Sequence, residues 1–155
     1  MMDALASTRV AATEGLMELA ASDPRVVLVC MDTVGVLKAD PFRVAYPDRL
    51  MDVGIAEQHA VAFASGLASC GMKPWVAAFA GFITMRACEQ VRTFVAYPHL
   101  DVKLIGANGG IAGGERDGAT HQFTEDLGIL RTMPGMTILV PADAGQVREA
   151  VLVAG

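Results

Sequence analysis

Continuously apolar runs alternate with longer amphipathic stretches along most of this chain. The run RVVLVCMD is apolar throughout and ends in a polar residue, which is typical of a central parallel strand. Similar runs predict strands at residues 25–32, 74–80, 101–107 and 136–143, and the stretches between them predict helices at 3–22, 56–70, 81–97 and 124–133, with a last helix after Asp143. Strands that alternate with helices predict a three-layer α/β/α fold with a mainly parallel sheet.

Helix starts and strand ends add detail to this fold. Thr124 is expected to cap one helix, and Asp143 with Gln146 resembles a capping box for the last one. Ligands of parallel sheets bind at the carboxyl ends of the strands. In this sequence those ends are the loops at Asp32, at Gly81-Phe82 and at residues 108–122, so we expect the functional side chains there.

The composition is unusually apolar, at 53% apolar and 19% charged residues, against about 45–50% and about 25% in typical soluble chains. A sheet covered on both faces, burial against partner chains, or both would account for it. Residues 60–85 hold a single charge, Lys73, but the interruption CGMKPW argues against a membrane span. The net charge of −5 offers no basic stripe for nucleic acid.

The cysteines and histidines show no metal-site or disulfide spacing. Three cysteines are scattered along the chain, and they are interpreted as reduced thiols of a cytoplasmic protein (Cys30, Cys70 and Cys88). Metal binding by this chain alone is therefore not expected.

Glu57 stands near the start of a predicted helix that is otherwise almost free of charge, DVGIAEQHAVAFASGLASCG. A lone acid there can simply complement the helix dipole. Its apolar neighbours, Ala60, Val61 and Phe63 among them, would however desolvate a carboxylate. A buried acid either holds its proton or finds a charged partner, and such groups concentrate at active sites.

Two further features lie at predicted strand ends. The glycine-rich loop NGGIAGGERDGATHQ lacks the pattern of a phosphate loop, and it is either a surface loop or a substrate loop in which Asp117 and His121 contact hydroxyls or move protons. Phe79 and Phe82, in FAGF, are either core residues or a clamp for a flat ring.

Two long segments, DVGIAEQHAVAFASGLASCGMKPWVAAFAGF and DGATHQFTEDLGILRTMPGMTILVPAD, strongly resemble the pyrimidine-binding domain of the transketolase family of thiamine diphosphate enzymes. The resemblance covers about residues 25–151. GIAEQHAV is also close to 1-deoxy-xylulose-5-phosphate synthase, whereas the THQ element is more similar to transketolase proper.

The resemblance implies a role for each matching residue. Glu57 aligns with the catalytic glutamate that hydrogen-bonds the ring nitrogen of the cofactor's aminopyrimidine and promotes the imino tautomer, which then takes the proton from the thiazolium carbon. Phe79 and Phe82 match aromatic residues around the pyrimidine ring. Met85 replaces a third aromatic residue of the family, so the ring pocket is expected to be looser or reshaped.

Other positions of the resemblance concern the cofactor and the substrate. Ile55 and, with a weaker match, Asp32 fall near the pyrimidine pocket. Asp117 and His121 match the acid and the histidine that contact substrate hydroxyls, and His121 is also expected to act in catalysis.

The family's diphosphate-and-metal motif, G-D-G followed some residues later by Asn, does not occur in this sequence. The resemblance therefore implies that residues 1–155 are one module, possibly truncated at the C-terminus, of a split enzyme. Another chain or domain would hold the diphosphate and Mg²⁺ or Ca²⁺, in a homodimer or a heterotetramer that acts on sugar phosphates. The alternatives are a module of a decarboxylating enzyme, such as the synthase above or the beta chain of a 2-oxo acid dehydrogenase, and a non-catalytic protein that binds a partner.

Overall fold

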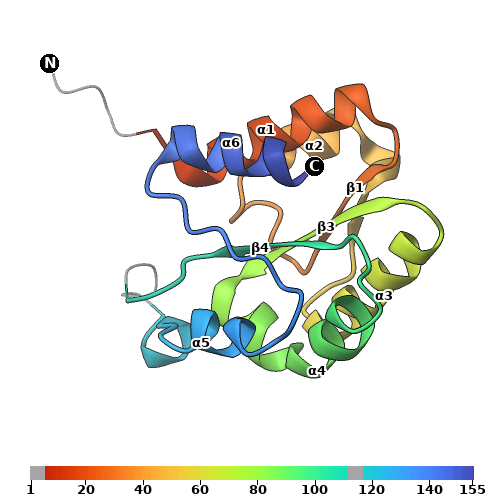
Figure 1. Ribbon diagram of the computed structural model, residues 1–155. Helices are drawn as coiled ribbons and strands as arrows, with labels where there is room; N and C mark the ends of the chain where they lie inside the picture. Colours follow the sequence, from red (N-terminus) through yellow and green to blue (C-terminus); the bar gives the residue numbers. More distant parts are fainter. Residues whose placement is uncertain (1–5, 112–116) are drawn as a thin grey trace, which may run out of the picture.

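A computed structural model describes residues 6–111 and 117–155 of the chain. Its centre is one parallel sheet with the strand order β2-β1-β3-β4 (Figure 1). The strands are β1 (Val26–Cys30), β2 (Leu50–Asp52), β3 (Lys73–Phe79) and β4 (Lys103–Ala107). Because all four run in the same direction, their carboxyl ends meet at one edge of the sheet.

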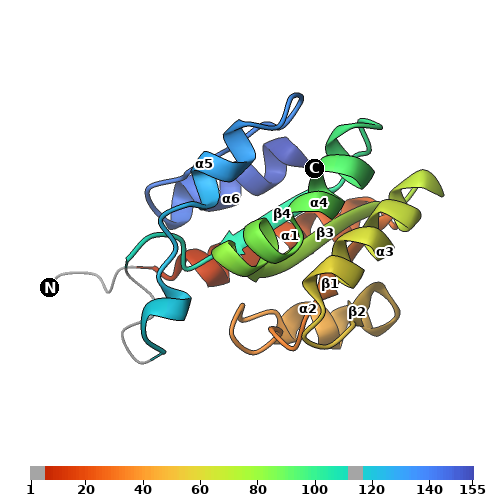
Figure 2. The ribbon, with the colours of Figure 1, turned by 90° about the horizontal axis from the view of Figure 1, so that it is seen from below.

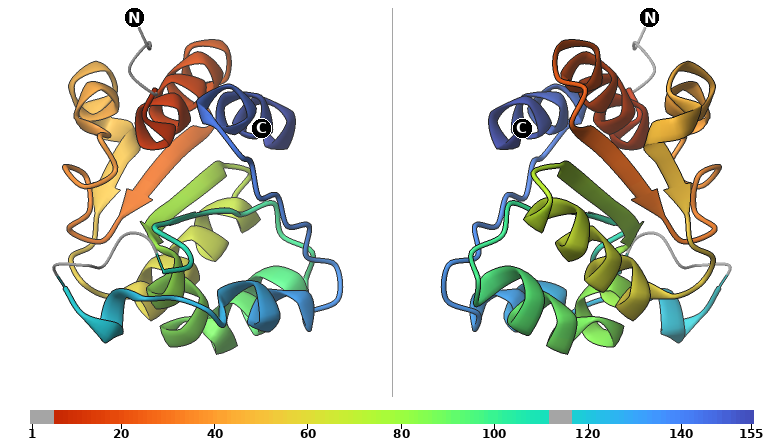
Figure 3. Two further views of the ribbon diagram at one scale, coloured as in Figure 1. Left: turned by 90° about the vertical axis from the view of Figure 1, so that its left-hand side faces the viewer. Right: turned by 90° about the vertical axis from the view of Figure 1, so that its right-hand side faces the viewer.

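Helices cover both faces of the sheet, which confirms the predicted three-layer α/β/α fold. One face carries α1 (Thr8–Ser22), α2 (Asp40–Ala45) and α6 (Ala144–Ala154), and the other carries α3 (Glu57–Ser69), α4 (Cys88–Gln90) and α5 (Asp126–Arg131) (Figures 1 and 3). Figure 2 shows the second face, with α3 and α4 lying in front of the sheet. The short elements are the 3-10 helices η1 (Pro47–Arg49) and η4 (Ala119–His121) and the π-helices η2 (Phe82–Arg86) and η3 (Val91–Ala96).

The period-two alternation of the strands divides the core into two layers. Leu28 and Cys30 pack with Trp75 toward α1, α2 and α6, while Val29 and Val76 pack toward α3 and η3. Both faces of β1 and β3 are therefore buried, which explains why these strands are continuously apolar in sequence.

The helix predicted at residues 81–97 is divided. It consists of the π-helix η2, the single α-helical turn α4 and a second π-helix, η3. Apolar spacing cannot distinguish the wider π turns from α turns, because both bury one face of the segment. Single π turns in proteins often occur at functional sites.

The prediction of a strand at residues 136–143 is wrong. This segment has no strand assignment in the structure, and Leu139 and Val140 are 53% and 70% exposed. It passes the edge of the sheet on its way from α5 on one face to α6 on the other (Figures 1 and 3). Its apolar run TILV pairs with no strand of the described sheet, because an apolar run indicates burial and does not by itself fix strand pairing.

The helix caps give a mixed outcome. The predicted cap at Thr124 is wrong, because α5 begins at Asp126 with Glu125 as its N-cap, and the Glu125 side chain accepts a hydrogen bond from the Thr124 backbone. Asp143 does cap α6: its Oδ1 accepts from the Gln146 N–H at 2.9 Å. The first helix begins at Thr8, and residues 3–5 of the prediction lie outside the described residues.

Three elements within residues 33–55 escaped the sequence reasoning, namely α2, the 3-10 helix η1 and the three-residue strand β2. β2 is too short to show alternation. Within the described part of the chain, no helix is long and apolar enough to cross a membrane.

Candidate functional site

The carboxyl edge between β1 and β3 is the topological switch point of the sheet, because β2 lies on one side of this pair and β4 on the other. Open parallel sheets bind ligands in the crevice at such a point. The Thr33 hydroxyl donates to the Ala77 carbonyl at 2.9 Å and ties the loop after β1 to β3. The switch point is thus built from the loop that contains Asp32 and the end of β3 at Phe79.

Asp52, at the end of β2, organises the loop that leads to α3. Its Oδ1 accepts hydrogen bonds from the Asp32 N–H at 2.8 Å and the Gly54 N–H at 3.1 Å. Gly54 adopts a φ of 72°, which glycine tolerates well. Sequence reasoning did not single out Asp52, although an aspartate two residues before a glycine is a turn signal.

Glu57 is the first residue of α3 and is buried, with 7% of the residue exposed. The unpaired N–H groups of the first helical turn favour an anion there. Nη1 of Arg86 donates to Oε1 of Glu57 at 2.9 Å, and the Arg86 side chain is 48% exposed. Of the two states that the sequence leaves open for a buried acid, the structure shows the one with a charged partner.

The same guanidinium covers the Phe82 ring. Cζ of Arg86 lies 3.8 Å from the ring centroid, a cation–π contact between the two ends of η2. One planar group therefore spans Glu57 and Phe82. Sequence reasoning missed Arg86, and its position four residues after Phe82 was the available signal.

Four rings form an aromatic cluster at the ends of β3 and η4, defined as Phe79, Phe82, His121 and Phe123. The Phe82 centroid lies 4.9 Å from that of His121, 5.2 Å from Phe123 and 5.8 Å from Phe79, in near-perpendicular arrangements. Nδ1 of His121 lies 3.0 Å from the Thr120 hydroxyl. The cluster brings together three predicted residues from two separate segments, FAGF and the glycine-rich loop, and adds Phe123.

Phe123 fixes the cluster in place. It is 1% exposed and exchanges two backbone hydrogen bonds with Gly110, of 2.7 and 2.9 Å, which close the loop between them. Its ring lies so close to Gly81 that a Cβ added to that glycine would stand 1.8 Å from Cδ1 of Phe123. The sequence FAGF therefore needs a glycine between its two aromatic residues.

The remaining predicted residues lie around this site in different environments. Ile55, 73% exposed, lines an open hollow of about 400 Å³ together with Glu57, His59 and Arg86. Met85 is 42% exposed, and Asp32, with a φ of 57°, is also exposed. Asp117 is exposed just before η4, at the end of the glycine-rich loop, and residues 112–116 of that loop lie outside the described residues.

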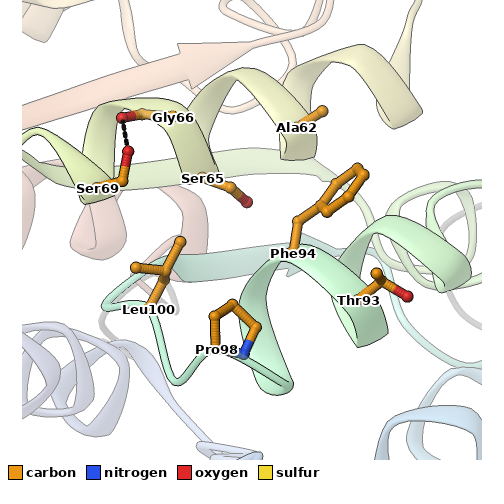
Figure 4. Close-up of a pocket in the computed structure, with 8 residues that line it drawn as sticks. All are labelled: Ala62, Ser65, Gly66, Ser69, Thr93, Phe94, Pro98 and Leu100. Carbon is orange, nitrogen blue, oxygen red and sulfur yellow. Dashed lines mark hydrogen bonds between the residues drawn. The ribbon is translucent and has the colours of Figure 1, made fainter.

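A second hollow of about 460 Å³ lies between α3 and η3 (Figure 4). Its walls are small residues of α3, where the Ser69 hydroxyl donates to the Gly66 carbonyl at 2.7 Å, and apolar residues such as Phe94 and Leu100. Among the described residues, no titratable side chain lines it, whereas Glu57 lines the first hollow.

In the described part of the chain, no group of three or more His, Cys, Asp and Glu side chains is placed to hold a metal ion. Burial raises the pKa of the Cys30 thiol to about 12, and the negative charge of Asp52 adds to the effect. Cys30 therefore stays protonated and acts as a core residue.

These features define a parallel α/β domain with a buried acid and an aromatic cluster at its ligand-binding edge. The family model of the transketolase pyrimidine binding domain matches residues 5–154, and the chain belongs to this family.

Relatives and solved structures agree with this assignment. The chain is 40% identical to one subunit of an apulose-4-phosphate transketolase of Phocaeicola vulgatus, over 97% of this chain and 48% of that protein. It is also 40% identical to a 1-deoxy-D-xylulose-5-phosphate synthase of Desulfotalea psychrophila, over 90% of this chain and 21% of that protein. A solved structure described as a split gene transketolase, inactive beta4 tetramer, superposes with a TM-score of 0.85 at 37% identity, covering 97% of this chain and 48% of the other. The chain thus spans about half the length of the first of these relatives, and about a fifth of the second.

Proposed function

We propose that this chain is the pyrimidine-binding module of a transketolase-like enzyme that transfers a two-carbon ketol unit between sugar phosphates with thiamine diphosphate as cofactor. The observation that carries the proposal is the arrangement of Glu57 and Phe82 around one planar, N–H-bearing group, the Arg86 guanidinium. An aminopyrimidine ring that has taken up a proton at its ring nitrogen presents the same two features: a flat face to stack and an N–H that donates to the carboxylate.

The residues present fit the pyrimidine half of the cofactor. The hollow at Glu57 is open to solvent on one side and contains a buried carboxylate on the other. Phe82 and Phe79 provide aromatic surface beside it. Offset-stacked or edge-to-face contact with a heterocycle is the geometry that such rings favour.

Thiamine diphosphate, when bound, supplies a carbon nucleophile at its thiazolium ring. In this proposal Glu57 holds or releases a proton at a ring nitrogen of the aminopyrimidine, and Phe79 and Phe82 orient that ring. Burial of the carboxylate excludes water from the proton's path and strengthens its hydrogen bond. Ile55, which lines the hollow at Glu57, is assigned to the wall of the same pocket, and Met85 and Asp32 are assigned to its surroundings.

His121 and Asp117 are assigned to the substrate. The aromatic cluster holds the His121 ring, so its nitrogens have a defined direction at the edge of the sheet. Asp117 lies four residues earlier on the exposed loop. A histidine and an acid in this position suit hydrogen bonds to sugar hydroxyls and proton transfer at the substrate.

A partner chain or domain is part of the proposal. It would bind the diphosphate and Mg²⁺ or Ca²⁺, and the assembly would be a homodimer or a heterotetramer. Support comes from the names of the relatives, a transketolase subunit and a split gene transketolase described as inactive in its beta4 form, and from the share of their length that this chain spans. Ile55 and Met85 are exposed apolar residues of the proposed pocket region, and we expect the assembly to cover them.

The test is turnover by the enzyme assembled from this chain and a diphosphate-binding chain, with ketose and aldose phosphates as substrates. Glu57→Gln and Glu57→Ala are expected to abolish turnover while the chain stays folded. This chain by itself is expected to show no turnover and weak binding of thiamine diphosphate. Retained turnover of the Glu57 variants would contradict the role of the glutamate, and robust turnover by the chain alone would contradict the split site.

A second candidate function is a decarboxylating synthase module, which the 40% identity to a 1-deoxy-D-xylulose-5-phosphate synthase favours. The two functions differ in the donor substrate. Carbon dioxide release from pyruvate by the assembled enzyme would support the synthase, and ketol transfer from a ketose phosphate without carbon dioxide would support the transketolase.

A further inference from the structure

We propose that Arg86 is a built-in occupant of the pyrimidine pocket that has to swing out before the cofactor can bind. This inference rests on the proposed function and deepens it. The Arg86 guanidinium takes both contacts that the proposed function gives to the pyrimidine ring: the hydrogen bond to Glu57 and the face of Phe82. The arginine and the cofactor would therefore compete for one site.

The geometry requires this competition. Nη1 of Arg86 stands 2.9 Å from Oε1 of Glu57, and Cζ stands 3.8 Å from the Phe82 centroid, which is ordinary stacking distance. A flat ring that lies over the same face of Phe82 and also forms a hydrogen bond with the same Oε1 needs the volume of the guanidinium. The other aromatic contacts of Phe82, to Phe79, His121 and Phe123, are near-perpendicular, so within this site the Arg86 guanidinium is the planar group that lies over the Phe82 ring.

The Arg86 side chain is positioned to move out of the pocket into solvent. Its side chain is 48% exposed, whereas the Glu57 side chain is 8% exposed, so the arginine can reach water while the acid cannot. Arg86 is the last residue of the π-helix η2 and lines the mouth of the hollow. A half-exposed ion pair is weak because water screens it. The carboxylate thus keeps a charged partner until a ligand replaces it. Breaking this weak ion pair takes only a small part of the ligand's binding free energy.

The test measures the dissociation constant of thiamine diphosphate by titration calorimetry with the assembled enzyme, at fixed Mg²⁺. Arg86→Ala removes the competitor and is expected to tighten binding by about tenfold, the size of one weak ion pair with one exposed cation–π contact. Arg86→Lys keeps the charge without the planar stack and is expected to fall between Arg86→Ala and the wild type. Arg92→Ala, which removes an exposed arginine of η3, is the matched control and is expected to bind like the wild type.

The outcomes separate the two proposals. If Arg86→Ala binds no tighter than the wild type while Glu57→Gln abolishes turnover, the inference about Arg86 is wrong and the proposed function stands. If Glu57→Gln keeps full turnover, or the wild-type assembly binds no thiamine diphosphate, both are wrong.

A crystal structure of the assembled enzyme with thiamine diphosphate gives an independent readout. We expect the guanidinium to have left both Glu57 and the face of Phe82. Persistence of the Arg86–Glu57 hydrogen bond and of the stack on Phe82, with the pyrimidine bound beside them, would overturn the inference even if Arg86→Ala changed the affinity.

Discussion

Arg86 and Glu57, 29 positions apart in sequence, form a hydrogen-bonded ion pair of 2.9 Å that joins the end of η2 to the first turn of α3. These segments follow β3 and β2, on the two sides of β1 in the sheet. The pair therefore connects the two segments that flank the switch point. It links Glu57, the acid assigned to the cofactor, with η2, the π-helix that carries Phe82 of the aromatic cluster.

We predict that Glu57→Gln hardly changes the stability of the fold. The variant leaves a half-exposed arginine without its partner, and arginine can be solvated there, so the free energy of unfolding should fall by about 1 kcal/mol or less. Urea unfolding of the isolated chain measures this. Glu14→Gln, which neutralises an exposed acid of α1, is the matched control. A loss of about 3 kcal/mol or more would show a buried structural charge pair instead.

Gly81→Ala is predicted to disrupt the aromatic cluster. The new Cβ would stand 1.8 Å from Cδ1 of Phe123, so the buried ring has to shift. Overpacking of this kind costs about 1–3 kcal/mol in the free energy of unfolding. The measurement is urea unfolding together with the near-ultraviolet circular dichroism of the aromatic rings.

Gly66→Ala is the control for this experiment. It lies within α3, and a Cβ there meets nothing within 4 Å. That substitution should stabilise the chain by about 0.5–1 kcal/mol, the usual helix preference for alanine. Equal effects of the two substitutions would refute the steric argument for Gly81.

The sequence predicted the parts of the fold that repeat a simple period. β1 and β3 are buried on both faces, so their apolar runs identified them as strands of a parallel sheet. Residues 136–143 have a similar apolar run, but they pass the edge of the sheet without pairing with β4. An apolar run indicates burial and strand propensity, but it does not determine whether the segment pairs with a neighbouring strand.

In the site, too, some residues could be predicted from local sequence and others depend on the tertiary fold. Glu57 stood out because an acid among apolar neighbours is locally anomalous, and Phe79 and Phe82 because they flank a predicted strand end. Phe123 gave no such local signal, and Arg86 gave only its spacing from Phe82, since the contacts of both depend on pairings made by the tertiary fold. The roles given to the predicted site residues stay predictions until the variants are measured.

Asp52→Ala is predicted to loosen the loop that presents Glu57. The substitution removes the acceptor of two backbone hydrogen bonds, from Asp32 and Gly54, and should lower the free energy of unfolding by about 1–2 kcal/mol. Turnover of the assembled enzyme should also fall, because the first turn of α3 loses its fixed position. Asp52→Asn keeps an acceptor oxygen and should restore most of both. If the asparagine variant is as impaired as the alanine variant, the negative charge rather than the hydrogen bonds is what matters.

Asp23, at the end of α1, is predicted to contribute to the acid sensitivity of the chain. Arg25 donates to its carboxylate through Nε at 3.0 Å, Nη2 at 2.7 Å and the backbone N–H at 2.9 Å, and Lys73 Nζ stands 3.4 Å away. The hydrogen bonds from Arg25 hold the pKa of Asp23 well below its ordinary value of 3.8. A lowered pKa in the folded state means that the unfolded chain takes up the proton first as the pH falls.

The stabilising contribution of Asp23 is therefore fully present above a pH of about 4 and is lost progressively below it, toward the lower pKa of the folded state. Asp23→Asn removes this contribution. The wild type should be more stable than the variant at about pH 6, and the difference should shrink as urea unfolding is repeated at pH values down to about 2.5. Asp48→Asn, at an exposed acid, serves as the control, with a difference that stays near zero throughout. A gap between wild type and Asp23→Asn that stays constant or widens toward acid would mean that the Arg25 contacts do not favour the ionised carboxylate in solution.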